Sequence, residues 1–263
     1  MRKGNKLIAL LLIMVSTIFS VNPVTAEAKT NNLTAKQILK KATATSSKIK
    51  SFTMTQDVQM TLKYDGKTYK QSSKEQVQYN KNPLRVKKVS TFKSNGEKNQ
   101  SIDYYVKKGS KIYNYAKTAN GDYTEIKTHG IKASDLNGMN PGKQLKELMK
   151  YFENTKMKNK TEKVSGRSAY VITAQMDMGK LMELSNDGTD EDLQEVKGQK
   201  IKVTYWIDNK TYYPLKCTID LKSVYNSLLE STPSLEMKVS KCIITVNYTK
   251  INKTLKIKLP NVK

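Results

Sequence analysis

Strict alternation of apolar and polar residues predicts a long β-strand over residues 52–64. Apolar side chains occupy six of the seven even positions of this stretch, whereas every odd position from 53 to 63 carries a polar side chain. Because successive side chains of a strand point to opposite faces of the sheet, this strand has one apolar and one polar face. The pattern leaves open whether the apolar face covers an ordinary core or a bound ligand.

Turn signals divide the rest of the chain into further strands. Asp65-Gly66 is typical of a two-residue hairpin turn, and Asn80 to Pro83, Ser94-Asn95-Gly96 and Asn120-Gly121 mark later turns. We therefore expect a meander of antiparallel strands over residues 67–79, 84–92, 101–106, 111–115 and 123–128. A second run of strands is expected over residues 164–176, 201–208, 215–221, 237–248 and 255–259.

Helical spacing appears before the first strand and again in the middle of the chain. Thr34 and Gln37 fit a capping box, which predicts a helix over residues 35–48. Pro141 suits a first helical position and predicts a helix with an apolar stripe as far as Phe152. Shorter helical segments are expected over residues 180–184 and 224–229. One continuous curved antiparallel sheet with helices on one side accounts for this order of elements, so the predicted fold class is α+β.

The N-terminus has the features of a secretory signal peptide. A basic start precedes an apolar run over residues 7–21, and Ala26 and Ala28 are the small residues of a cleavage site. The run is shorter than the ~20 residues of a membrane-spanning helix, which disfavours an uncleaved anchor. We expect residues 1–28 to be removed and residues 29–263 to form a single secreted domain.

The charge balance favours anionic partners. The chain carries 47 Lys and Arg against 23 Asp and Glu, a net charge of +24, and an exported protein of this charge is attracted to phospholipid headgroups or teichoic acids. General solubility is the alternative reading of the same charge. Lysine greatly outnumbers arginine, the usual base-reading residue, so nucleic acid is not an expected partner.

The two cysteines, Cys217 and Cys242, lie in strand-like runs in step with apolar neighbours. Export permits a disulfide between them. The alternative is that both are small buried hydrophobic side chains on facing strands.

The residue types that most catalytic and metal sites need are scarce. The single histidine, His129, lies in a turn-like Thr-His-Gly context, and a catalytic triad or a histidine-based zinc site needs more. Asp187, Asp190 and Asp192 belong to an acidic segment over residues 186–195, but their spacing does not fit an EF-hand. We read this segment as a solvated loop, and we expect no metal site, cofactor or catalytic activity.

The most distinctive segment is a predicted hairpin over residues 203–221. It contains Trp206-Ile207-Asp208, a turn, and a return strand that opens at Pro214; Asp favours the turn, and Pro at the first position of a strand loses no ladder hydrogen bond. This pattern resembles the hairpin of the LolA/LolB-like lipoprotein-carrier superfamily and of related Gram-positive cell-surface proteins. The resemblance implies an incomplete antiparallel barrel, or half-barrel, with helices covering its concave face and acyl chains in the hollow. The lipobox cysteine that such Gram-positive relatives often keep is missing here. The resemblance therefore supports the fold more strongly than it supports the kind of molecule that is bound.

Together these expectations describe a secreted, monomeric, non-catalytic protein that holds an amphiphile at the anionic cell envelope, with association to the cell wall. The candidate groove residues are Phe52, Met54, Val58, Met60, Leu62 and Trp206. The alternative is a structural or sensory cell-wall module that binds a protein or teichoic acid and has a closed core without a ligand.

Overall fold

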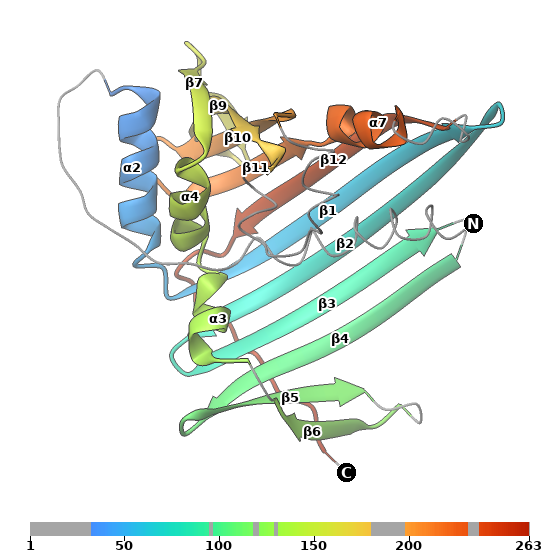
Figure 1. Cartoon of the computed structure of the whole chain (residues 1–263). Helices are drawn as coiled ribbons and strands as arrows, with labels where there is room; N and C mark the ends of the chain where they lie inside the picture. Colours follow the sequence, from blue (N-terminus) through green and yellow to red (C-terminus); the bar gives the residue numbers. More distant parts are fainter. Residues whose placement is uncertain are drawn as a thin grey trace.

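The computed structural model describes residues 33–94, 97–117, 121–128, 131–179, 198–230 and 237–262. Within these residues, twelve strands form one curved antiparallel sheet that does not close into a barrel (Figure 1). The strand order is β6-β5-β4-β3-β2-β1-β12-β11-β10-β9-β7, and β8 pairs with β9. The predicted α+β class and the curved, incomplete antiparallel barrel are confirmed.

The first half of the sheet is a meander of hairpins. Its strands are β1 (Ser51–Tyr64), β2 (Lys67–Lys81), β3 (Leu84–Ser94), β4 (Glu97–Lys108), β5 (Lys111–Lys117) and β6 (Tyr123–Lys127). Asp65 and Gly66 both have positive φ at the β1–β2 turn, as a two-residue hairpin turn that matches the strand twist requires. β4 begins at Glu97, four residues before its predicted start, and it continues its pairing with β3 to the end of that strand.

The second half joins the first through a long-range pairing of β1 with β12. Its strands are β7 (Phe152–Met157), β8 (Glu162–Val164), β9 (Arg167–Asp177), β10 (Lys200–Asp208), β11 (Pro214–Asp220) and β12 (Met237–Thr249). The hairpin of β10 and β11 is present at its predicted place, with Pro214 as the first residue of its return strand.

Three sequence predictions in this half were wrong in detail. Ser165 and Gly166 have positive φ and form the turn between β8 and β9, so residues 164–176 are not one strand. Phe152 begins β7 rather than completing the second helix. Residues 255–259 form no strand. Their alternation nevertheless separates two sides of the segment, because Leu255 and Ile257 are buried and the lysines beside them are exposed.

The helices lie on the concave side of the sheet (Figure 1). They are α2 (Ala35–Ser46), α3 (Ala133–Gly138), α4 (Pro141–Met149) and α7 (Lys222–Glu230). The expected Thr34–Gln37 capping box begins α2, and Pro141 is at the start of α4. We call the sheet face that packs against these helices the inner face, and the opposite face the outer face.

The described residues form three apolar clusters that hold the structure together. The largest joins α2, α4 and α7 to the inner face of β1 and β9–β12. A second lies between the inner face of β1–β3 and Leu136 of α3. The third lies on the outer face, where Leu255 and Ile257 of the C-terminal tail cover Tyr104, Val106 and Tyr115.

Several expectations fall outside the described residues. These are the signal peptide with Ala26 and Ala28, the helical segment 180–184, the acidic segment 186–195 and His129. In the part of the chain that the structure describes, no helix has the length and hydrophobicity needed to cross a membrane.

Candidate ligand-binding site

The apolar residues of β1 lie together on the inner face of the sheet, as their alternation predicts. Phe52, Met54, Val58 and Met60 are all buried, and Leu62 is half-buried. The burial of the first four residues is compatible with an ordinary core and equally with the base of a groove. Of these five residues, only Leu62 keeps a partly exposed side chain, and Tyr64, the next residue of β1 on this face, is exposed.

The buried residues of β1 divide between two of the apolar clusters. Phe52 stacks on Tyr79 of β2, with 5.0 Å between ring centroids, and meets Tyr248 of β12 edge-on at 6.1 Å. Val58 and Met60 belong instead to the large cluster under α2 and α7. The inner face of β1 therefore has two apolar sections, which the buried Gln56 separates and which belong to different clusters.

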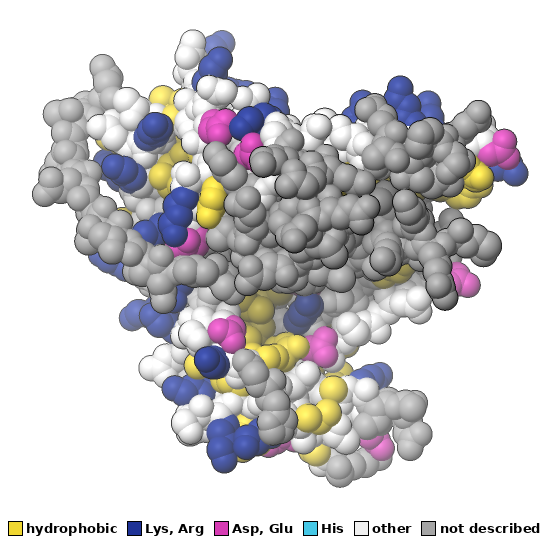
Figure 2. Space-filling model, in the orientation of Figure 1, with side chains coloured by type: hydrophobic (Ala, Val, Ile, Leu, Met, Phe, Trp, Pro, Cys, Tyr) yellow, Lys and Arg dark blue, Asp and Glu magenta, His cyan; other side chains and the backbone are white. Residues whose placement is uncertain are grey.

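Next to these residues of β1, the inner face of β2 and β3 carries two aromatic side chains. The cross-strand register places Tyr69 opposite Leu62 and Phe92 opposite Ser73. Both aromatic side chains are half-buried. Figure 2 shows this side of the molecule, where hydrophobic side chains are visible beside α3 and over the sheet between α3 and β5, with charged side chains among them. Aromatic and aliphatic side chains in such a setting can contact the apolar part of a ligand.

A charged cluster lies on the same inner face, on β2, β3 and β4. Lys88 of β3 stands directly opposite Asp103 of β4, and its Nζ lies 2.7 Å from Oε2 of Glu75 on β2. Burial raises the pKa of the Asp103 carboxyl; Lys88 lowers it in part, and Glu75 raises it further. Burial and then the charge of Asp103 also raise the pKa of the neighbouring Tyr105. These groups can donate and accept hydrogen bonds on a part of the inner face that also carries polar residues such as Ser73, Ser90 and Ser101.

Sequence reasoning missed this charged cluster. Glu75, Lys88 and Asp103 are far apart in a lysine-rich sequence and look like ordinary polar strand residues. Only the register of β2, β3 and β4 brings them together. The absence of apolar alternation in β2 was the available signal, because it indicated that this half of the inner face is not a plain core.

Trp206 is not part of the inner face, which corrects its assignment to the groove. Its neighbours Tyr205 and Ile207 are buried in the large cluster, so alternation along β10 places Trp206 on the outer face. There its Nε1 donates to Oε2 of Glu162 at 2.8 Å, and Nζ of Lys216 lies 4.5 Å from the ring centroid. The half-buried indole covers the outer face beside β8.

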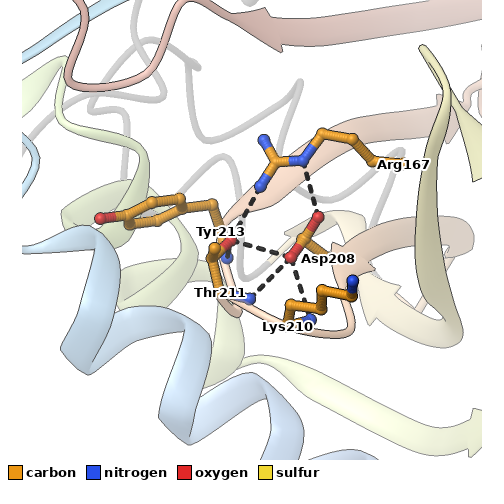
Figure 3. Close-up of polar contacts among 5 residues, drawn as sticks. All are labelled: Arg167, Asp208, Lys210, Thr211 and Tyr213. Atoms are coloured by element: carbon orange, nitrogen blue, oxygen red, sulfur yellow. Dashed lines mark hydrogen bonds and ion pairs between the residues drawn. The ribbon is translucent and has the colours of Figure 1, made fainter.

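Asp208 organises the distinctive hairpin (Figure 3). Its Oδ1 accepts hydrogen bonds from the backbone nitrogens of Lys210 and Thr211 at 3.0 and 2.6 Å and from Thr211 Oγ1 at 2.9 Å. Nε of Arg167 on β9 lies 2.7 Å from Asp208 Oδ2. Burial alone raises the pKa of this carboxyl, but the hydrogen bonds from Thr211 and Lys210 and the charge of Arg167 outweigh burial, so the pKa is lowered. The motif therefore fixes a turn and ties it to β9.

The two cysteines are free and buried. Cys217 stands opposite Val246, so Cys242 lies four residues further along β12, about 13 Å away at the rise of a strand. Disulfides join Cα atoms less than ~7 Å apart, so this register favours the reading of two small buried side chains. Burial raises the pKa of each thiol to about 12.

Among the described residues, no group of three or more His, Cys, Asp or Glu side chains is placed to hold a metal ion. The acidic segment that offered hard oxygen ligands lies outside those residues.

The open sheet, the helices on its concave face and the β10–β11 hairpin together define a LolA/LolB-like fold. The chain belongs to the family of unknown function DUF6612, whose sequence pattern matches residues 34–262. Comparison with curated proteins finds no match for this chain.

Two solved mycobacterial structures are similar to this chain. LprF from Mycobacterium bovis is similar at 12% identity and a TM-score of 0.50, over 86% of this chain and 96% of LprF. The lipoprotein LppX from Mycobacterium tuberculosis is 16% identical with a TM-score of 0.48, over 85% of this chain and 98% of LppX. At these identities the likeness to LprF concerns the fold alone.

Proposed function

We propose that the exported chain is a non-catalytic carrier or binding protein that holds an amphiphile against the inner face of its sheet. The observation that carries this proposal is the mixed character of that face. Buried apolar residues of β1 adjoin the half-buried Leu62, Tyr69 and Phe92. The cluster of Glu75, Lys88 and Asp103 lies further along the same face, with Glu75 two residues along β2 from the partner of Phe92. The LolA-like fold supports the same proposal, because an incomplete barrel leaves room that a closed small barrel fills with side chains.

In this proposal the two parts of the ligand have different contacts. The hydrocarbon part lies along Leu62, Tyr69 and Phe92, over the apolar base that Phe52, Met54, Val58 and Met60 provide. The polar part meets the charged cluster, whose groups can pair with a headgroup. Flexible methionine side chains suit apolar ligands of varied shape. We further propose cleavage after Ala28 and function as a monomer outside the cytoplasm, at the anionic cell envelope.

The direct test is to purify the mature chain from cells, extract it with organic solvent and analyse the extract by mass spectrometry. An acyl-chain lipid or lipopeptide at a near-stoichiometric ratio is the expected result. Protein that carries no amphiphile, and that takes up none from labelled lipid vesicles, contradicts the proposal.

A substitution pair tests the place of binding. Phe92→Lys puts a charge on the inner face of β3, whereas Thr91→Lys puts the same charge on the outer face one residue away. We expect Phe92→Lys to lower the uptake of labelled lipid about tenfold, since a buried or half-buried charge disfavours apolar contact. Thr91→Lys should retain uptake, and an equal loss in both variants contradicts binding at this face.

The second candidate function is a cell-wall module with a closed core and no ligand. The burial of Phe52, Met54, Val58 and Met60 favours it, because these side chains already have protein neighbours. This candidate predicts retention on purified cell wall, release by salt and no lipid uptake, which together separate it from the carrier.

A further inference from the structure

The outer face of the long central strands carries exposed lysines near the ends that lie away from α2 and α4. Alternation and register place all of them on this face, and all are exposed. We call them the outer lysine set: Lys63, Lys70, Lys93, Lys98, Lys238 and Lys241. They belong to β1, β2, β3, β4 and β12, so only the folded sheet gathers them.

Two pairs within this set face each other directly. Lys63 of β1 is opposite Lys238 of β12, and Lys93 of β3 is opposite Lys98 of β4. Like charges in directly opposed positions destabilise a sheet. None of these four lysines forms an ion pair with a described carboxylate. This arrangement of lysines therefore does not stabilise the fold, and a bound external anion would reduce the repulsion between them.

The spacing lets the set act as one positive patch. Lys241 and Lys70 flank Thr61 on neighbouring strands, which separates their backbones by about 10 Å. The row of Lys63 and Lys238 is two residues further along β1, about 7 Å away. These separations are near the Debye length of about 8 Å at physiological ionic strength, so the potentials of the lysines add.

The shape and composition of this face suit a flexible polymer better than a bilayer. Proteins that lie on membranes insert Trp, Phe or Leu side chains below the headgroups. Of the described large hydrophobic side chains that are exposed, only Tyr64 belongs to β1–β4 or β12, and alternation places it on the inner face. The outer face is also the convex side of the sheet (Figure 1). A flat bilayer touches a convex surface over a small area, whereas a chain of phosphates can follow its curve.

We propose that the outer lysine set binds a linear phosphodiester polymer of the cell envelope, of the teichoic-acid type. This specifies the envelope contact within the proposed function, and it does not depend on lipid binding at the inner face. The two faces of one sheet then have separate tasks, with an amphiphile inside and a polyanion outside.

The test compares the mature chain with two variants of equal charge, using poly(glycerol phosphate) as the probe. The outer variant carries Lys63→Gln, Lys93→Gln, Lys98→Gln and Lys238→Gln. The control variant changes four exposed lysines of α2, α4 and β8: Lys36→Gln, Lys40→Gln, Lys143→Gln and Lys163→Gln.

We expect the polymer to bind the wild-type chain with an affinity that falls steeply with salt. The outer variant should lose at least about tenfold in affinity, since each lysine near an anionic surface contributes measurably, and the control variant should lose much less. The outer variant should unfold at the same temperature as the wild type or higher, because it removes two repulsive pairs. Co-purified lipid should be unchanged in it, which distinguishes failure here from failure of the carrier proposal.

Three results overturn the inference. The first is no binding of the polymer by the wild-type chain. The second is an equal loss in both variants, which shows a dependence on net charge alone. The third is tighter binding to vesicles of phosphatidylglycerol and phosphatidylcholine that the outer variant also loses, which identifies a bilayer as the partner.

Discussion

At the scale of single residues, Asp208 shows how one side chain serves several parts of the fold. It closes its own turn through Lys210 and Thr211 and binds Arg167 from another strand. Hydrogen bonds to a charged group contribute more than neutral ones, and here several converge on a buried carboxylate. The sequence identified the turn role of this residue, whereas its partner on β9 came from the tertiary structure.

Asp208→Asn should destabilise the protein in a pH-dependent way. The amide keeps an acceptor for the turn but loses the ion pair, so we expect a loss of about 1–2 kcal/mol at neutral pH. Because the folded pKa of Asp208 is lowered, its contribution is present above the unfolded value of about 3.9 and is lost as pH falls through the folded pKa. Urea unfolding from pH 7 to pH 3 should show the difference shrinking toward acid.

Asp57→Asn, on the outer face of β1, is the control for this measurement. A difference between Asp208→Asn and wild type that stays constant from neutral to acid pH would refute the role of the ionised carboxylate.

The cysteines should behave as buried thiols. With each pKa raised to about 12 by burial, little thiolate exists at neutral pH, and thiolate is the reactive form. A thiol reagent should label neither cysteine in the native protein and both in urea. Reducing agent should leave the unfolding midpoint unchanged; a fall in that midpoint would reveal a disulfide.

At the scale of secondary-structure elements, the contact between α2 and α4 depends on a glycine. The end of α2 lies directly against Gly142 in the first turn of α4. A Cβ atom on Gly142 would lie 2.5 Å from the backbone nitrogen of Ser47 and 2.6 Å from the carbonyl carbon of Ser46. Backbone atoms cannot move aside as the end of a flexible side chain can, so the two helices approach closely only because this side chain is absent.

Gly142→Ala should therefore destabilise the helix pair despite the better helix propensity of alanine. Propensity favours Ala by about 1 kcal/mol, whereas overpacking costs roughly 1–3 kcal/mol. Thermal unfolding should show a net loss, and Lys143→Ala, at the exposed neighbouring position, should be neutral or slightly stabilising. An unchanged or higher melting temperature for Gly142→Ala would show that the helices separate easily.

At the scale of the whole molecule, the chain returns to cover its own sheet. The C-terminal tail crosses the outer face, where Leu255 and Ile257 pack on Tyr104, Val106 and Tyr115. Asn80 Nδ2 donates to the Leu255 carbonyl at 2.8 Å, and Tyr123 forms a bridge with Val262. The tail thus joins the end of the chain to the β2–β6 half of the sheet, which the inner-face helices cover least.

Replacing both Leu255 and Ile257 with alanine should weaken this half of the sheet. Each buried aliphatic side chain lost costs about 2 kcal/mol or more, so the pair should lower the free energy of unfolding by about 4 kcal/mol or more. Urea unfolding measures the loss, and Lys256→Ala with Lys258→Ala is the matched control on the exposed side of the tail. Equal stability of the two double variants would mean that the tail contributes no packing.

The sequence by itself determined the features that depend on neighbouring residues. Side-chain alternation in residues 52–64, the Asp65-Gly66 turn, the capping box at Thr34 and the hairpin at Asp208 all appear in the structure as expected. Each involves atoms a few residues apart, so local sterics and hydrogen bonding decide them. The curved, open sheet followed from the order of these elements and from the resemblance of the hairpin.

Tertiary structure alone decided what depends on pairing between distant strands. The register of β2, β3 and β4 brings Glu75, Lys88 and Asp103 together, and the pairing of β1 with β12 gathers lysines from both ends of the chain. A shift of one residue in register moves every side chain of a strand to the other face of the sheet. Alternation alone therefore cannot show which face is the inner one, and for this reason it did not predict the position of Trp206. Long-range pairing is set by the packing of the whole core, which no short segment encodes.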